Sequence, residues 1–112
     1  MGTLRTPQTE AKYQQAIREG LTVPLAEIPS LIEWKFWKLV KNQYPHDLVL
    51  KEHDLLIPLR VFALPGEMTM NEIRELFEIL EELSNQYDSI KFNYPVQQSV
   101  RNHFHLHLQV NK

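Results

Sequence analysis

The feature that most constrains this chain is an alternating stretch near the C-terminus, residues 102–110, with the sequence NHFHLHLQV. Polar and apolar residues alternate in it, which is the period of a β-strand with two unlike faces. The pattern predicts a core face made of Phe104, Leu106, Leu108 and Val110. It predicts a second face made of His103, His105, His107 and Gln109. Side chains two positions apart on a strand lie roughly 6.5–7 Å apart, so these imidazoles can converge on one anionic group or one metal ion.

Length and composition narrow the class of protein. The 112 residues, 43% hydrophobic and 23% charged, fit one globular domain, residues 1–112. A net charge of −2 provides no basic surface for DNA or RNA, so we expect no nucleic-acid partner. The absence of cysteine excludes disulfides and cysteine-based zinc sites. No apolar run approaches the ~20 residues of a membrane span, and the N-terminus is too polar for a signal peptide, so we expect a cytoplasmic protein with no membrane partner.

Local patterns predict two helices. Residues 7–19, followed by Gly20 as a C-terminal stop, suit a helix within an N-terminal lead-in of residues 1–30. Residues 69–72 fit a capping box, in which Thr69 and Glu72 each satisfy a backbone N–H of the other. The apolar residues that follow recur at helical spacing as far as Leu83, which predicts the firmer of the two helices.

Three further segments are expected to be strands, at residues 34–42, 53–59 and 89–94. Their connections are short enough for antiparallel neighbours, which predicts an α+β domain with helices on one face of the sheet. The histidines would then face outward from the other side. Trp34 and Trp37 are expected in the core, and His46 is expected to be a solvated turn residue.

The histidine row permits three interpretations. A neutral histidine can attack phosphorus while its neighbours donate hydrogen bonds to the phosphoryl oxygens. Alternating histidines also suit a zinc or iron site, which His53 or His46 would complete. The third interpretation is a sheet surface on which the imidazoles bond only to one another. Arg60 and Arg101 flank the proposed site in sequence, after the 53–59 strand and before the histidine row, and are candidates to pair with phosphate.

Several motifs in order resemble the histidine triad (HIT) superfamily. Its alternating signature corresponds to residues 103–109, HFHLHLQ, which depart from it only at the last position. A family strand of the form His-x-Leu-Val-Ile-Pro is similar to residues 53–58, HDLLIP. The family's helix, its Asn before the triad and its Gln-Ser-Val triplet correspond to residues 69–83, Asn93 and residues 98–100. The resemblance covers residues 36–110.

The resemblance implies a nucleotide-binding fold with a five-stranded antiparallel sheet, often in a homodimer. It implies hydrolysis or transfer of a nucleotidyl group from a nucleotide or dinucleotide substrate through a covalent nucleotidyl-histidine, with no cofactor or metal. By position, His105 would be the nucleophile, His103 would orient it, His107 would contact the phosphate or leaving group, and His53 would support them. The expected nucleotide- and phosphate-binding residues are Asn93, Gln98, Ser99 and Gln109.

Two alternatives stay open. Residues 105–109, HLHLQ, also resemble the transferase branch that includes galactose-1-phosphate uridylyltransferase, in which His107 would be the nucleophile and Gln109 a neutral donor. We favour His105, because the three-histidine pattern uses every histidine present. The second alternative is a nucleotide-binding module without catalysis. It is motivated by the absence of glycine from residues 94–102 and by Leu59, which stands where the family carries lysine.

Overall fold

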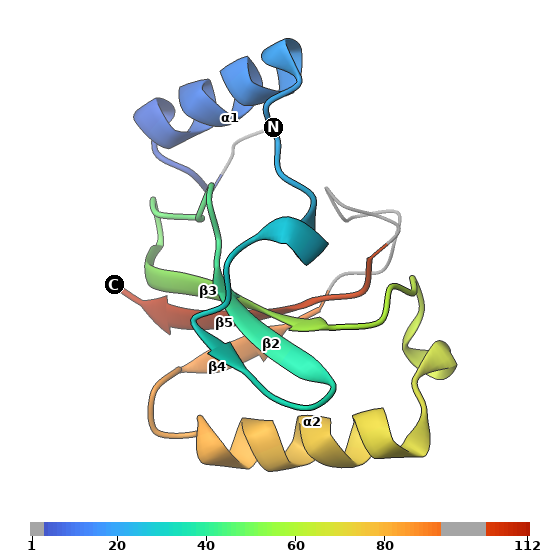
Figure 1. Cartoon of the computed structure of the whole chain (residues 1–112). Coiled ribbons are helices and arrows are strands. Elements are labelled where there is room, and N and C mark those ends of the chain that lie inside the picture. The colour runs from blue at the N-terminus through green and yellow to red at the C-terminus, as the bar shows by residue number, and fades with distance from the viewer. Residues whose placement is uncertain (1–3, 93–102) are drawn as a thin grey trace.

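The computed structural model describes residues 4–92 and 103–112, and its centre is a five-stranded sheet. The strands lie in the order β1-β2-β3-β5-β4, and every neighbouring pair is antiparallel (Figure 1). Their bounds are β1 Ile32–Glu33, β2 Trp37–Lys41, β3 Leu50–Pro58, β4 Ser89–Lys91 and β5 Leu106–Asn111. The α+β class expected from the sequence is confirmed.

The predicted capping box begins helix α2 (Met70–Glu82). The Thr69 hydroxyl accepts the Glu72 N–H at 3.1 Å, and the Glu72 carboxylate accepts the Thr69 N–H at 2.7 Å. The apolar stripe of α2 packs against one face of the sheet, and the indole N–H of Trp37 donates to the Glu72 carbonyl at 2.9 Å. The prediction that Trp37 lies in the core is therefore confirmed. The larger apolar cluster contains Trp37, Leu39, Leu56, Phe62, Leu76, Ile79, Leu83, Phe104, Leu106 and Leu108.

A second apolar cluster lies on the opposite face of the sheet. It joins Leu25 and Ile28, at the short 3-10 helix η1 (Leu25–Glu27), to the strand residues Val40, Leu55 and Ile57. Helix α1 (Pro7–Glu19) also lies on this side, across the sheet from α2 (Figure 1). The prediction that the helices share one face is thus wrong. The physical reason is that β2 and β3 carry apolar residues on both faces, and both faces need cover.

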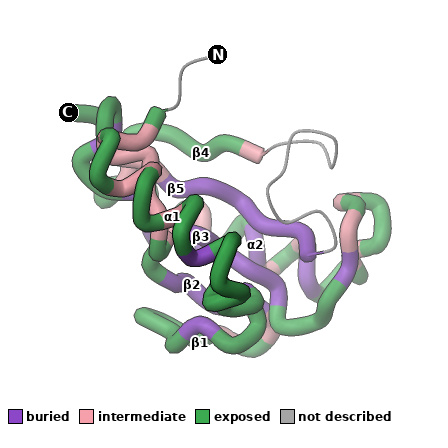
Figure 2. The backbone as a smooth tube through the Cα atoms, turned by 90° about the horizontal axis from the view of Figure 1, so that it is seen from above, coloured by how far each residue is buried: buried purple, intermediate pink, exposed green. Residues whose placement is uncertain are grey.

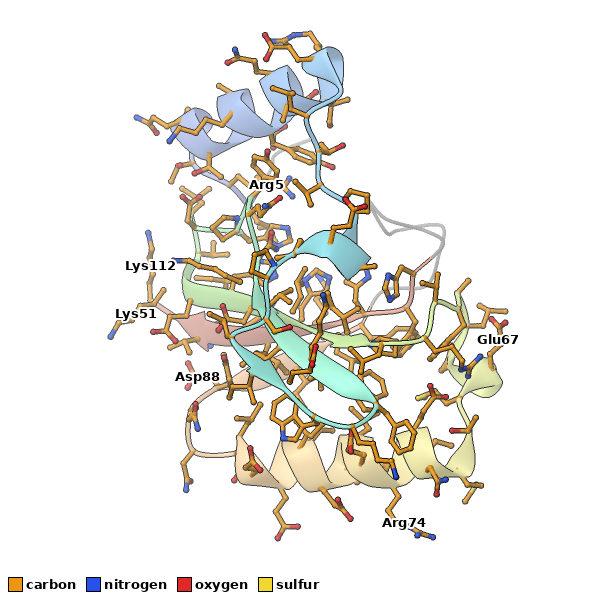
Figure 3. The ribbon with its side chains drawn as sticks, viewed as in Figure 1. Arg5, Lys51, Glu67, Arg74, Asp88 and Lys112 are labelled. Atoms are coloured by element: carbon orange, nitrogen blue, oxygen red, sulfur yellow. The ribbon has the colours of Figure 1, made fainter. Side chains whose placement is uncertain are left out.

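Helix α1 has the bounds that the sequence predicts. The Thr6 hydroxyl accepts the Thr9 N–H, and Gly20 ends the helix at φ +67°, the left-handed conformation that glycine adopts without strain. The helix is tied down at its N-terminus, where the Asp47 carboxylate accepts the Thr6 N–H at 2.8 Å. Next to it, Arg5 lies between α1 and the sheet and donates to the Tyr44 carbonyl at 2.7 Å (Figure 3). These contacts anchor α1 on the turn that connects β2 to β3.

The strands differ from their expected bounds. The segment predicted at 34–42 is shortened to β2, the one at 53–59 begins earlier at Leu50, and β4 ends at Lys91. Residues 93 and 94 lie outside the described part. The histidine strand begins only at Leu106, which pairs with Leu56. Its partner strand β3 ends at Pro58. Proline has no N–H, so it cannot extend the backbone pairing toward His105 and His103. In residues 4–92 and 103–112, no helix is both long and apolar enough to cross a membrane.

Candidate functional site

The histidine face of the sheet is buried. Relative exposure is 6% for His103, 5% for His105, 8% for His107 and 3% for His53. The expectation that these side chains face solvent is therefore wrong. Leu55 pairs with His107 in register and belongs to the second apolar cluster, so the imidazoles share their face of the sheet with a hydrophobic core. Figure 2 shows β5 mostly buried, whereas α1 and the edge strand β4 are mostly exposed.

Lys38 anchors the segment around η1 to this face of the sheet. It lies on β2 with its Nζ buried, and it donates to the Ala26 carbonyl and to the Ile28 carbonyl, both at 2.9 Å. These two carbonyls flank the end of η1. The lysine thereby fixes the segment that carries Leu25 and Ile28 against the histidine side of the sheet.

His53 and His107 are joined ring to ring. The Nε2 atom of His53 lies 2.7 Å from the Nδ1 atom of His107, and the ring centroids are 4.9 Å apart. The antiparallel pairing of β3 with β5 produces this contact, because His53 opposes Gln109 and Leu55 opposes His107 in register. On its other side, Nδ1 of His53 accepts the backbone N–H of His46 at 2.9 Å.

His105 and His103 bond to backbone carbonyls. Nδ1 of His105 lies 2.9 Å from the carbonyl oxygen of His103, and Nε2 of His103 lies 3.0 Å from that of Pro58. A carbonyl only accepts, so in each case the ring nitrogen carries the proton. In neutral His105 this leaves Nε2 as the unprotonated nitrogen with a lone pair. The ring of His105 lies 5.1 Å from that of His107, centroid to centroid.

Burial lowers the pKa of all five histidines, and this is the largest cause in each case. It lowers the pKa of His53 to about 4 and that of His107 to about 3. Positive charges nearby add to the effect: Lys91 lowers the pKa of both, and Arg5 lowers that of His53. At pH 7 the cluster is therefore neutral, and its imidazoles act as hydrogen-bond donors, acceptors and potential nucleophiles.

His46 belongs to this cluster, although the sequence analysis expected a solvated turn residue and considered it only as a further ligand of a metal site. Its ring centroid lies 4.6 Å from that of His53 and 6.1 Å from that of His107, and the His46 and His107 rings are inclined to each other by 21°. The expected solvated turn residue is thus half-buried, and its Nδ1 atom is buried without a hydrogen-bond partner. The signal was the short connection between β2 and β3, which returns the chain to the sheet within a few residues of His53.

The remaining predicted site residues are placed differently. Gln109 is half-buried on the histidine face, and its Oε1 accepts the Ser89 hydroxyl at 3.4 Å. Asn93, Gln98, Ser99 and Arg101 lie outside the described residues, so their roles stay predictions. Arg60 binds both carboxylate oxygens of Glu72, at 2.7 and 3.2 Å, and so lies at the start of α2. In residues 4–92 and 103–112, no three histidine, aspartate or glutamate side chains are arranged to hold a metal ion.

No protein-family model matches the chain, and no curated protein matches it. Several solved structures, however, are similar to this chain. A structure described as a HIT family hydrolase, from Legionella pneumophila Philadelphia 1, matches with a TM-score of 0.55 and 27% identity, covering 75% of this chain and 85% of that one. A structure described as a HIT-like protein matches with a TM-score of 0.59 and 19% identity, covering 89% of this chain and 98% of that one. The first similarity supports the histidine triad superfamily, and both support a HIT-like fold.

Proposed function

We propose that this chain, with its HIT-like fold, is a nucleotide hydrolase or nucleotidyltransferase that acts through a covalent nucleotidyl-histidine on His105. One observation carries the assignment: the 2.9 Å contact of His105 Nδ1 with the His103 carbonyl. Because that nitrogen bears the proton, the lone pair lies on Nε2. Burial keeps the pKa of His105 below its ordinary value, so the ring is neutral near pH 7.

The chemistry follows from a neutral nucleophile. Nε2 of His105 attacks the phosphorus of a nucleoside phosphoramidate or dinucleoside polyphosphate, and a P–N bond forms as the bond to the leaving group breaks. The leaving group departs with a proton taken from solvent water. Water, or an acceptor in a transferase, then attacks the phosphorus, breaks the P–N bond and restores His105. The 2.9 Å hydrogen bond to the His103 carbonyl stabilises the positive charge that develops on the ring during attack.

The contacts of His107 favour His105 over His107 as the nucleophile. Nδ1 of His107 is paired with Nε2 of His53, whereas His105 has no contact of this kind with a second imidazole. The competing assignment follows the transferase branch, in which His107 attacks and Gln109 is a neutral donor. Gln109 instead contacts Ser89 on the edge strand. We place His107 as a phosphate or leaving-group contact.

The proposal is tested by intact-protein mass spectrometry after brief, acid-free quenching with nucleoside phosphoramidates and dinucleoside polyphosphates. The sharpest variant is His105→Asn, since the amide nitrogen of asparagine reproduces the Nδ1–H donor to the His103 carbonyl but has no counterpart of Nε2. We expect a nucleotide-sized adduct on the wild type and none on His105→Asn, with turnover reduced more than about a thousandfold.

Two outcomes would overturn the assignment. An adduct that persists in His105→Asn and disappears in His107→Ala would identify His107 as the nucleophile and favour the pattern of the transferase branch. Tight binding of a mononucleotide with neither adduct nor product from any substrate would favour the non-catalytic binding module.

A further inference from the structure

We propose that Lys91 on β4 is a substrate-binding residue that pairs with an anionic leaving group, so that this site favours dinucleoside polyphosphates over nucleoside phosphoramidates. The inference rests on the proposed function above and names its substrate class. Lys91 is not among the site residues that the sequence predicts. Nothing in the local pattern of residues 89–94 singles it out, because only strand pairing brings it to the histidines.

Lys91 lies directly opposite His107 in the pairing of β4 with β5. Directly opposite residues of antiparallel strands share a face of the sheet, with Cβ atoms about 4.5–5.5 Å apart. The next pair, Ile90 with Leu108, lies on the α2 side, because Leu108 belongs to the larger apolar cluster. Since the faces alternate along a strand, Lys91 lies on the histidine face, next to His107.

Lys91 is exposed at the edge of the sheet, whereas the imidazole beside it is buried (Figure 2). Within residues 4–92 and 103–112 it forms no ion pair, and residues 93–102 contain neither aspartate nor glutamate. Arg5, a second cation near the cluster, donates instead to the Tyr44 carbonyl and to the Glu10 carboxylate. Of the two cations, Lys91 is therefore the one whose donors are available to a ligand.

The charge of Lys91 acts on the histidines at this end of the cluster. Burial is the largest cause that lowers the pKa of His46, His53 and His107, and the positive charge of Lys91 adds to it. The neutral rings offer an anion hydrogen bonds but no charge. Lys91 provides the positive charge that they lack, as an ammonium on a flexible stem that binds phosphate as a point charge.

The leaving group decides whether this charge matters. His107 is the phosphate or leaving-group contact of the proposed reaction, and its ring lies 5.1 Å from that of His105, centroid to centroid. A group that departs on the His107 side therefore lies next to Lys91. A dinucleoside polyphosphate releases a nucleoside phosphate with negative charge, whereas a phosphoramidate releases an amine without one. A cation beside the leaving group stabilises only the first of these as it departs.

The kinetic experiment compares kcat/KM for a dinucleoside tetraphosphate and for a phosphoramidate of the same nucleoside. Lys91→Met keeps the aliphatic stem and removes the charge. We expect it to lower kcat/KM for the polyphosphate at least about tenfold, and that for the phosphoramidate less than about threefold. Lys91→Arg should retain the preference of the wild type. The loss in Lys91→Met should shrink at high salt, which screens an exposed charge.

The matched control is Lys41→Met. Lys41 is exposed on β2 and follows Val40, which belongs to the cluster on the histidine side, so Lys41 points to the other face of the sheet. The control should leave both values of kcat/KM unchanged. Unchanged polyphosphate turnover in Lys91→Met, or an equal fall for both substrates, would overturn the inference.

A binding measurement separates this inference from the proposed function, because it needs no turnover. Titration calorimetry compares a nucleoside monophosphate with the methylene-bridged triphosphate of the same nucleoside, for each of the common bases. We expect the wild type to bind the triphosphate analogue at least about tenfold more tightly, and Lys91→Met to lose that preference. A wild type without the preference would overturn the inference. A Lys91-dependent preference with neither adduct nor product would count against the proposed function alone.

Discussion

His53 and His107 lie 54 residues apart in sequence, yet their ring nitrogens approach to 2.7 Å across the pairing of β3 with β5. Both rings are buried, and neither is charged at pH 7 because burial lowers the pKa of each. The contact is consequently a hydrogen bond between neutral imidazoles. Its strength and its pH dependence give two predictions.

Removing the donor of this pair is expected to destabilise the protein. His53→Ala leaves Nδ1 of His107 buried without a partner, which costs about 1–3 kcal/mol in the free energy of unfolding. His53→Gln is the matched variant, because its amide N–H can still donate toward His107. In urea unfolding at pH 7.5, we expect the free energy of unfolding to be highest for the wild type, lower for His53→Gln and lowest for His53→Ala. Equal stability of the two variants would contradict the importance of the hydrogen bond.

Acid is expected to destabilise the fold well above the range of carboxyl titration. Above pH 6.5 both the folded and the unfolded histidines are neutral, so they contribute no pH dependence. Below pH 6.5 these two histidines bind protons in the unfolded chain. In the folded state they stay neutral, because the pKa of His53 is about 4 and that of His107 is about 3. The free energy of unfolding should therefore fall by more than about 1 kcal/mol from pH 7 to pH 5.

The measurement is urea unfolding at several pH values between 7.5 and 5. His53→Gln, which removes one of these groups, should show a shallower fall with decreasing pH than the wild type. A stability that stays constant over this range would contradict neutral, buried histidines.

The lysine that holds the η1 segment gives a third prediction. Lys38→Met fills the same space but removes the donor to the Ala26 and Ile28 carbonyls, so we expect a loss of about 1–3 kcal/mol. Backbone amides around η1 should exchange faster with deuterium. Lys41→Met, at an exposed position on the same strand, should change neither quantity by more than about 0.5 kcal/mol or twofold. Similar behaviour of the two variants would show that Lys38 does not hold the segment.

The start of α2 gives the fourth prediction. Glu72 completes the capping box and binds Arg60, which holds the pKa of this carboxyl below its ordinary value. Glu72→Ala removes both contacts and leaves the Thr69 N–H without its acceptor, for an expected loss of about 1–2 kcal/mol. Glu78→Ala, at an exposed position of the same helix, is the control. Thermal unfolding monitored by circular dichroism should separate the two variants by several degrees.

Local patterns predicted what depends on neighbours along the chain. The bounds of α1, the Gly20 stop and the Thr69–Glu72 capping box all match, because each depends on hydrogen bonds within a few residues. The alternation correctly placed Phe104, Leu106 and Leu108 in the core and the histidines on the other face, whereas Val110, also expected in the core, is only half-buried. Strand ends were less accurate, since where a ladder stops depends on the partner strand.

The burial of the histidine face could not be predicted in the same way. Alternation shows that two faces differ, but it does not show whether another segment of the chain packs on the polar one. Leu25 and Ile28 pack on that face of the sheet and Lys38 holds them there, although their segment was interpreted as an irregular connection. The expectation that His46 is solvated was wrong for a related reason, because its neighbours His53 and His107 approach it only in the folded chain.

The sequence by itself determined the two α-helices, the two unlike faces of the final strand and the presence of a histidine row, since these depend on side-chain period and local capping. Only the tertiary structure decided which imidazole nitrogens carry protons. That choice depends on a backbone N–H of His46, a carbonyl of His103 and a ring of His53 brought to the same place by antiparallel pairing and a turn. A proton's position is fixed by the partner at hydrogen-bond distance, and such partners are neighbours in space rather than in sequence.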